Sequence, residues 1–494
     1  MMLRIVALAV AGLLATAVPA GATPAQTGPI GAGPHPPGPT DPPGGPTGTD
    51  AWAWTQLTSR GTQIRYVTND SSQSCPSVRY TYMGSRGSFP LHLVSTPSTS
   101  QFPTTVCEVG VPLTASNAVL ELTTVHADTL HPASGQLPLP RWTATTRPSR
   151  IAVIGDTGCS VPVTGPVQDC ANGWPFEQIA NRVTDRTRPD LVIHTGDYLY
   201  REDPSRENDQ VQNPGCTNRA EAASWDCVVA DFFRPAERLL AAAPVALARG
   251  NHEDCNPGLQ GGAGGAWFRY LADDLRNDGR CTLFSPVALL RAGTLTLANV
   301  DSSFADPADN GGTANQSVFT RQFDAVNQAA AQHPHDDYFV LTHKPLWMVK
   351  AAGFTPGAVT WVTPVLDRAV AGTHLQRLAD NVRLALSGHI HLYQMLDFNT
   401  ARPPQLTVGS AGGPLDDGPD DSNVERQSIG TPPQQVHQSI TQLQNPGGAG
   451  VFGFADLRYD GTTWGLAFRD RTGAVRGRTC TLSTSTANKT FTCH

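Results

Sequence analysis

Five short apolar stretches, each followed within a few residues by a polar motif, constrain this 494-residue chain more than any other feature. Apolar runs of this length are typical of buried strands, and helical patterns alternate with them, which indicates an α/β fold. In an open α/β sheet, the residues that follow the strands gather at the carboxyl edge. We therefore expect the five motifs to form one site. The runs are 151–154 before Gly155-Asp156-Thr157-Gly158, 191–193 before Gly196-Asp197-Tyr198-Leu199-Tyr200, 245–248 before Gly250-Asn251-His252-Glu253, 338–341 before Thr342-His343-Lys344-Pro345, and 384–386 before Gly388-His389-Ile390-His391.

The side chains in these motifs are of the types that bind metal ions. Carboxylate, amide and phenol oxygens and imidazole nitrogens supply enough ligands for two ions, and the absence of cysteine favours Fe, Zn or Mn over softer metals. Each motif alone is common in turns or cores, but five of them in order at strand ends indicate a shared function. The predicted ligands are Asp156, Asp197, Tyr200, Asn251, His343, His389 and His391.

The ordered set GD-x-G, GD-x-x-Y, GNH-E, x-x-H and GH-x-H resembles the calcineurin-like metallophosphoesterases, specifically their purple acid phosphatase branch. The resemblance covers residues 150–475 and implies a four-layer α/β/β/α sandwich with a dinuclear metal site at the sheet edges. Most members of that family have a histidine where this chain has Gly158, and the purple branch has a tyrosine ligand at the place of Tyr200. The missing histidine and the additional tyrosine are consistent with each other, and together they indicate the purple acid phosphatase branch. The alternative is that Tyr200 only packs.

The resemblance also implies where two metal ions bind. The first ion is expected to be Fe(III) and the second Fe, Zn or Mn, with one carboxylate bridging them. The bridging ligand would be Asp197; the first ion would take Asp156, Tyr200 and His391, and the second Asn251, His343 and His389.

The implied reaction is hydrolysis of a phosphate monoester, in which a metal-bound hydroxide attacks phosphorus in line with the leaving group. His252 would be the general acid and, with Asn251, would bind the substrate; the alternative is that His252 only supports neighbouring ligands. Glu253 would orient His252 or face solvent. Plant-type relatives carry further histidines after the fourth motif, whereas "HKPLWMVKAAG" has none, so the substrate contacts differ. Phosphodiesterase activity, or a non-catalytic binding or adhesion module on an inactive scaffold, are the alternative functions.

The charge balance does not favour a nucleic-acid partner. Lys and Arg number 35 against 42 Asp and Glu, which gives a net charge of −7, whereas nucleic-acid-binding surfaces are strongly basic. A small phosphate-ester substrate is compatible with this balance, because bound metal ions supply positive charge locally.

The N-terminus has the pattern of a secretory signal peptide, predicted for residues 1–22. Arg4 supplies the positive charge, residues 5–18 the apolar core, and Ala20-Gly21-Ala22 a small-residue cleavage site. A membrane-spanning helix needs about 20 apolar residues, more than this core provides, so an uncleaved anchor is the weaker alternative. No later stretch is long and apolar enough to span a membrane. We therefore expect a secreted, periplasmic or extracellular protein.

Composition divides the rest of the chain into three parts. Residues 23–50 are almost wholly Pro, Gly, Thr and Ala, which predicts an extended linker. Short β-prone runs at regular spacing predict a small all-β, sandwich-like domain over residues 51–148. Residues 149–494 form the predicted catalytic domain, with a polar insert near 417–448 that we expect to be a loop.

Ten cysteines in an exported chain are most simply explained by five disulfide bonds. They fall in near-neighbour pairs along the sequence, but spacing alone does not determine their connectivity. No CxxC pair is present, so disulfides are favoured over a thiolate metal site.

Overall fold

The computed structural model describes residues 49–72, 74–98, 102–122, 129–206, 215–216, 223–255, 262–276, 280–305, 313–352, 359–361, 363–441, 450–483 and 489–494. The predicted signal peptide and nearly all of the predicted linker lie outside these residues. Within them, no helix has the length and apolar character needed to cross a membrane.

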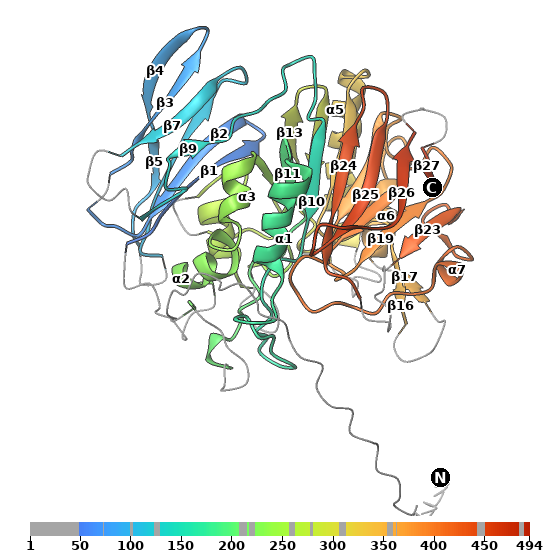
Figure 1. The fold of residues 1–494 in the computed structure, drawn as a ribbon. Helices are drawn as coiled ribbons and strands as arrows, with labels where there is room; N and C mark the ends of the chain where they lie inside the picture. Colours follow the sequence, from blue (N-terminus) through green and yellow to red (C-terminus); the bar gives the residue numbers. More distant parts are fainter. Residues whose placement is uncertain are drawn as a thin grey trace, which may run out of the picture. The chain divides into compact units, whose positions relative to one another are not determined.

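Two large β-sheets lie face to face at the centre of the fold, with a shared apolar core between them (Figure 1). The first sheet runs in the order β27 (Phe491–Cys493), β26 (Val475–Leu482), β25 (Trp464–Asp470), β24 (Gly453–Tyr459), β10 (Arg150–Ile154), β11 (Leu191–His194), β12 (Val245–Leu247), β1 (Ala51–Thr58), β2 (Gly61–Thr68), β6 (Thr105–Val111) and β5 (His92–Ser95), with β8 (Leu130–His131) also beside β1. The second runs β13 (Ala288–Ala292), β14 (Leu295–Asn299), β15 (Asp337–Leu341), β18 (Val382–Ser387), β20 (Gln405–Val408), β19 (Tyr393–Asp397) and β23 (Gln438–Thr441).

The central strands are apolar on both faces because both faces are covered. In β10, Ile151 and Val153 pack into the core between the sheets, whereas Ala152 and Ile154 pack against helices. This division follows the two-residue period of a strand. A continuous apolar run without alternation is what a strand buried on both sides requires.

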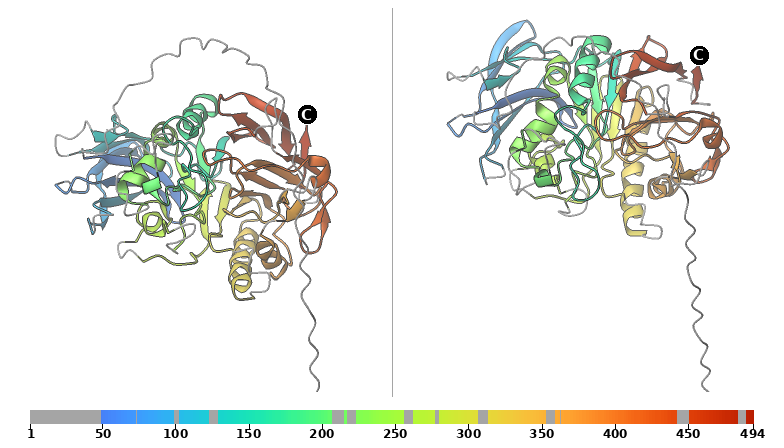
Figure 2. Two further views of the ribbon diagram at one scale, coloured as in Figure 1. Left: turned by 90° about the horizontal axis from the view of Figure 1, so that it is seen from below. Right: turned by 60° about the horizontal axis from the view of Figure 1, so that its bottom comes forward.

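Helices cover the outer face of each sheet, which completes the predicted four-layer α/β/β/α sandwich. The helical segments α1 and α3 lie in front of the first sheet in Figure 1, and α5 packs beside α6 on the other outer face (Figure 2). The first group comprises α1 (Phe176–Arg182), η2 (Val183–Thr187), α2 (Trp225–Val228), η4 (Val229–Phe233), α3 (Glu237–Ala242), α4 (Gly264–Ala266) and η5 (Trp267–Leu271); the second comprises α5 (Thr313–Gln332) and α6 (Pro364–Ala371); η3 (Pro204–Arg206) is a short 3-10 turn.

The N-terminal region is all-β, as predicted, but its strands are divided between two sheets. The strands β1, β2, β6 and β5 extend the first large sheet, since β1 pairs in parallel with β12. A separate small sheet packs on them through a core that includes Ile64, Tyr66 and Val78. The predicted boundary at residue 148 stays a prediction. The small sheet consists of β4 (Ser85–Pro90), β3 (Ser77–Tyr82), β7 (Ser116–Glu121) and β9 (Gln136–Leu137).

The predicted loop in the polar insert is wrong for much of the segment. Its strand β23 pairs with β19 at the edge of the second sheet, and Ile440 is buried there. The backbone of Thr441 donates to Asp421 Oδ1 at 2.7 Å. Backbone pairing at a sheet edge does not require an apolar run, so the composition hides this strand. The other elements here are α7 (Asp421–Val424) and the hairpin of β21 (Ser428–Ile429) with β22 (Gln434–Gln435); a further hairpin, outside the insert, joins β16 (Val349–Ala351) to β17 (Val359–Trp361).

Five disulfide bonds connect near neighbours along the chain. Each closes a loop locally, and two of them lie directly beside predicted metal-ligand motifs. The pairs are Cys75–Cys107, Cys159–Cys170, Cys216–Cys227, Cys255–Cys281 and Cys480–Cys493.

Candidate metal centre

All five predicted motifs follow strands that run in parallel within their sheets. The strands β10, β11 and β12 are parallel neighbours in the first sheet, and β15 and β18 in the second. Their carboxyl ends therefore lie at one edge of each sheet. Asp197 follows β11 and His343 follows β15, and a distance of 3.1 Å between Asp197 Oδ2 and His343 Nε2 brings the two edges together.

The first group of side chains surrounds the hydroxyl of Tyr200. Its Oη lies 2.8 Å from Asp197 Oδ2, 2.8 Å from His391 Nε2 and 3.1 Å from Asp156 Oδ1. His391 Nε2 lies 3.6 Å from Asp156 Oδ1. Three elements distant in the sequence thus direct oxygen and nitrogen atoms at one point.

The second group surrounds the same Asp197 carboxylate. Asp197, His343 and His389 each offer a ligand atom within 4.8 Å of the others. Asn251 joins them, because its Oδ1 lies 2.9 Å from His343 Nε2. Asp197 is therefore the one side chain common to both groups.

Three of these residues have a left-handed backbone that non-glycine residues rarely adopt. The φ angles of Asp156, Asp197 and His389 are 57°, 60° and 75°. Each such conformation costs about 1–3 kcal/mol and is typical of functional sites. The adjacent glycines are required by space: a Cβ at Gly250 would lie 2.0 Å from Asp197 Oδ1, and one at Gly388 would lie 2.3 Å from Asp156 Oδ2.

Gly158 lies directly against Tyr200. A Cβ at this position would lie 2.8 Å from the backbone nitrogen of Tyr200 and 2.9 Å from its Cδ2. Any side chain here, including a histidine, would collide with Tyr200. The combination of Gly158 with Tyr200 that the sequence motifs indicated therefore has a steric reason.

The buried charges of the two groups need a cation. Asp156 and Asp197 are almost fully buried, at 0% and 1% exposure. Burial and the nearby Asp197 raise the pKa of Asp156 well above its usual value. Burial acts to raise the pKa of Asp197 too, but His343 and His252 bring it well below the usual value. Two adjacent buried carboxylates are costly without positive charge, and carboxylate, phenol and imidazole ligands suit a hard or borderline metal ion. The side chains fit a metal site.

The imidazoles are held in the form that binds metal. Burial lowers the pKa of His389 well below its usual value and also lowers that of His391, which favours neutral rings. His343 Nδ1 lies 2.9 Å from the carbonyl of Thr195, and His391 Nδ1 lies 2.7 Å from that of Pro414. In both rings the backbone contact leaves Nε2 directed at the cluster.

Residues 149–393 match the family model described as calcineurin-like phosphoesterase. This domain of the chain belongs to that family. It is a phosphoester hydrolase, which confirms the predicted enzyme class.

One solved structure, a purple acid phosphatase, agrees with this assignment at the level of the fold. A purple acid phosphatase, PPD1, isolated from yellow lupin (Lupinus luteus) seeds is 14% identical, with 86% of this chain and 72% of that chain covered and a TM-score of 0.52. GAP50, the anchor in the inner membrane complex of Plasmodium, is 12% identical over 67% of this chain and 87% of that chain, with a TM-score of 0.35. No curated protein sequence matches the chain.

Two buried carboxylates hold the loop that carries two predicted ligands of this phosphoesterase. Glu253 accepts the backbone N–H groups of residues 197, 198 and 199 at 3.1, 2.9 and 3.1 Å, and that of Gly250 at 3.0 Å. Asp231 accepts the N–H of Tyr200 at 3.0 Å and the Nε of Arg201 at 2.7 Å. Four successive amides thus point at carboxylates. Glu253 neither orients His252 nor faces solvent, so both expectations for it are wrong.

A different acidic residue contacts His252. Its Nδ1 lies 2.6 Å from Glu202 Oε1, while its Nε2 lies 4.0 Å from Asp197 Oδ2. Burial acts to lower the pKa of His252, but Asp197 and Glu202 raise it overall. Glu202 was missed because an acidic residue just after a motif is usually solvated. Its place two residues beyond Tyr200 is the only sequence signal.

Proposed function

We propose that this phosphoesterase is a secreted or periplasmic hydrolase of small phosphate monoesters that uses two metal ions. The shared Asp197 carboxylate carries the proposal, since one of its oxygens lies within 3.1 Å of both Tyr200 Oη and His343 Nε2. A bridging ligand requires such a position between two groups. The five disulfides and the predicted signal peptide support export.

The two groups of side chains give the proposed ligand sets. Bound together, two metal ions would lower the pKa of water and offset negative charge at phosphorus. We expect Fe(III) at the site that contains tyrosine and Fe, Zn or Mn at the other. The first set is Asp156, Tyr200 and His391, the second is Asn251, His343 and His389, and Asp197 belongs to both.

His252 is the proposed general acid. Its contact with Glu202 fixes the ring through Nδ1, which leaves Nε2 on the side of the metal ligands. From there Nε2 can hold a proton for the leaving oxygen of the substrate. Asn251 and His252 are adjacent in the chain, and we propose that both contact the phosphate.

The choice of monoesters rests on the purple acid phosphatase among the similar structures and on the predicted tyrosine ligand. A diester needs space for a second substituent at the same site. Relative rates on p-nitrophenyl phosphate and bis(p-nitrophenyl) phosphate separate the two activities. Faster hydrolysis of the diester would replace the monoester proposal.

Metal analysis and a visible absorption spectrum of the purified mature protein test the centre. We expect two equivalents of metal and a tyrosinate-to-Fe(III) band that a Tyr200→Phe variant loses. Two equivalents without colour would indicate a Zn or Mn enzyme in which Tyr200 only packs. Absence of bound metal, together with absence of hydrolysis after metal addition, would favour a binding module on an inactive scaffold.

The role of His252 has a separate test. A His252→Ala variant should keep its metal content and lose roughly 10²–10⁴-fold in kcat on p-nitrophenyl phosphate. The loss should be smaller on substrates with very acidic leaving groups, because they need no proton. A loss of metal with the activity would instead assign His252 to ligand support.

A further inference from the structure

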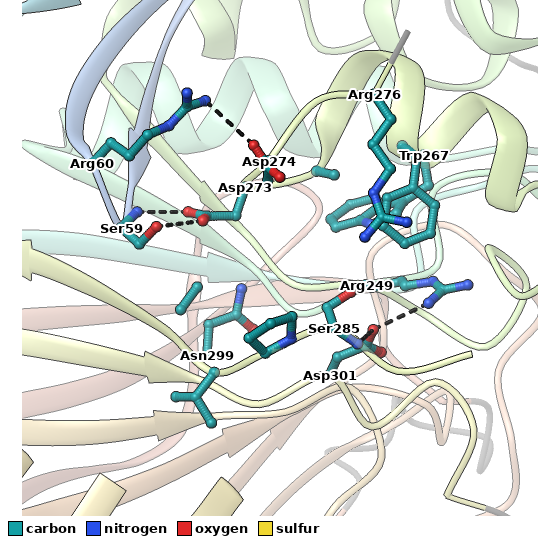
Figure 3. A pocket seen from close by; sticks show the side chains of 15 residues that line it. Ser59, Arg60, Arg249, Trp267, Asp273, Asp274, Arg276, Ser285, Asn299 and Asp301 are labelled. Carbon is teal, nitrogen blue, oxygen red and sulfur yellow. Dashed lines mark hydrogen bonds and ion pairs between the residues drawn. The ribbon is translucent and has the colours of Figure 1, made fainter. Parts of the chain in front are cut away.

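A cavity of about 340 Å³ lies beside the third motif and contains none of the proposed metal ligands in its lining (Figure 3). Its walls come from the turn after β1, from η5 and the residues that follow it, and from the segment that leads into β13 together with the end of β14. Arg249, which immediately precedes Gly250, closes one side. The volume is in the range of pockets that hold small organic molecules.

Arg276 differs from the other cations of this cavity in its contacts. Its guanidinium stacks over the ring of Phe268, 4.4 Å from the ring centre. Stacking uses the flat face of the group and leaves its five N–H donors in the plane. Among the described residues the one hydrogen bond of the guanidinium is a long one, 3.4 Å from Nη1 to the carbonyl of Arg280.

The acidic residues of the cavity already have partners. Asp273 accepts the backbone nitrogen and the hydroxyl of Ser59 at 2.6 and 2.5 Å. Asp301 Oδ2 accepts Arg249 Nη1 at 3.1 Å.

Asp274, at the rim, lies 3.9 Å from Arg60 Nη2. Within the described part of the chain, Arg276 is the lining cation that has no carboxylate within ion-pair distance. A bound anion would supply that missing charge.

Apolar residues form much of the remaining wall, beside the polar Ser285 and Asn299. The apolar lining residues are Trp267, Phe268, Ala272, Pro286, Val287 and Ala288. A ligand with a flat apolar body would remove this surface from water. The neighbouring Asp273 and Asp274 disfavour a ligand with several negative charges.

We propose that this cavity is a second ligand site, which binds a small aromatic molecule with a single carboxylate. The carboxylate pairs with the in-plane N–H groups of Arg276, and the ring packs against the apolar lining residues, which include Trp267 and Val287. Arg249 places the site next to the catalytic loop, because its Nε donates to the carbonyl of Glu253 at 2.8 Å. The proposal does not depend on the reaction at the metal centre.

Calorimetric titration of the mature chain with 2-naphthoate tests the proposal, with the neutral 2-naphthalenemethanol as the matched ligand. We expect 2-naphthoate to bind at least about tenfold more tightly than the alcohol, and Arg276→Gln to remove that preference, since hydrogen bonds to charged groups are the stronger ones. Val287→Trp, which fills the cavity, should abolish the binding of both ligands. Arg291→Gln, at an exposed ion pair on β13, is the control and should leave binding unchanged.

Several outcomes would overturn the proposal. They are equal binding of the two ligands, binding by Arg276→Gln as tight as by the unmodified chain, or no binding at millimolar concentration. Competition by inorganic phosphate that persists in Arg276→Gln would place 2-naphthoate at the metal centre instead. Hydrolysis of p-nitrophenyl phosphate by Arg276→Gln should match the unmodified chain, so a failed metal centre and a failed second site give different results.

Discussion

Gly158 and Tyr200 form a steric pair, and a single methyl group at position 158 is enough to test it. In Gly158→Ala the new Cβ would lie 2.8 Å from the Tyr200 nitrogen, an approach that real Cβ atoms do not make. We expect Tyr200 to move away from Asp156, so that any tyrosinate-to-Fe(III) band weakens or shifts. The visible spectrum and metal content measure this.

Gly173→Ala is the matched control, because its nearest neighbour is the Asp169 carbonyl at 3.6 Å. A Gly158→Ala variant with the spectrum and metal content of the control would contradict the steric argument.

The side chain of Glu253 stabilises the loop 197–200 through both of its oxygens, each of which accepts two amides. A Glu253→Gln variant keeps the shape but replaces one oxygen by an NH₂ group that faces amide donors. Burial and the nearby Asp197 raise the pKa of Glu253 to about 8, so the carboxylate is charged at pH 9. Hydrogen bonds to charged groups contribute about 1.5–3 kcal/mol, so we expect a loss of roughly 2–3 kcal/mol in the free energy of unfolding at that pH. Urea unfolding in the presence of EDTA measures it without a contribution from bound metal.

The exposed Glu177→Gln is the control and should change stability by less than about 0.5 kcal/mol. A loss for Glu253→Gln no larger than this would mean that the amides find other acceptors.

At the scale of elements, the sequence predicted the strands of the site and missed contacts that depend on register. Apolar runs with motifs at their ends identified β10, β11, β12, β15 and β18, because burial on both faces leaves a continuous signal. The pairing of β1 with β12 joins residues almost two hundred positions apart, and no local pattern encodes it. Glu202 and Asp231 likewise gain their roles only when separate elements meet. The strand β23 is polar and was taken for a loop.

A buried lysine, Lys489, precedes the last strand, β27. The free-energy cost of burying its charge should depend on pH. Lys489 is 0% exposed, and its Nζ donates to the carbonyl of Ala379 at 3.1 Å. Burial, with a contribution from Arg383, lowers its pKa to about 7. Above the unfolded-state pKa of about 10.4, Lys489 is neutral in both the folded and the unfolded state, so no charge is buried on folding. As the pH falls, the unfolded chain binds the proton first, so stability decreases until the pH reaches about 7.

A Lys489→Met variant should therefore gain several kcal/mol over the unmodified chain at pH 6, since each tenfold change in proton affinity corresponds to about 1.4 kcal/mol. The gain should be far smaller at pH 10. Urea unfolding of both proteins at the two pH values measures the difference. The exposed Lys350→Met is the control. A gain that does not change with pH would show that packing, not charge, limits stability at this site.

At the scale of the whole molecule, the N-terminal strands and the catalytic strands share one sheet and one core. Trp54 of β1 packs 5.2 Å from Phe233 of η4, ring centre to ring centre. The buried Arg65 of β2 donates to the carbonyl of Ala272 at 2.7 Å, and Gln56 donates to that of Leu271 at 2.7 Å. Removal of these strands would expose both the apolar face behind η4 and the backbone edge of β12. An exposed apolar sheet edge favours aggregation.

We expect a chain that begins at residue 149 to be insoluble or aggregated, although it contains every proposed metal ligand. Size-exclusion chromatography of that fragment, expressed alone or together with residues 49–148, measures this. Co-expression should restore a soluble complex, because β1 supplies the missing neighbour of β12. The matched control is a chain that begins at residue 49, which keeps every described strand. A monomeric fragment 149–494 with full metal content would show that the catalytic layers fold independently and that the shared sheet contributes little to their stability.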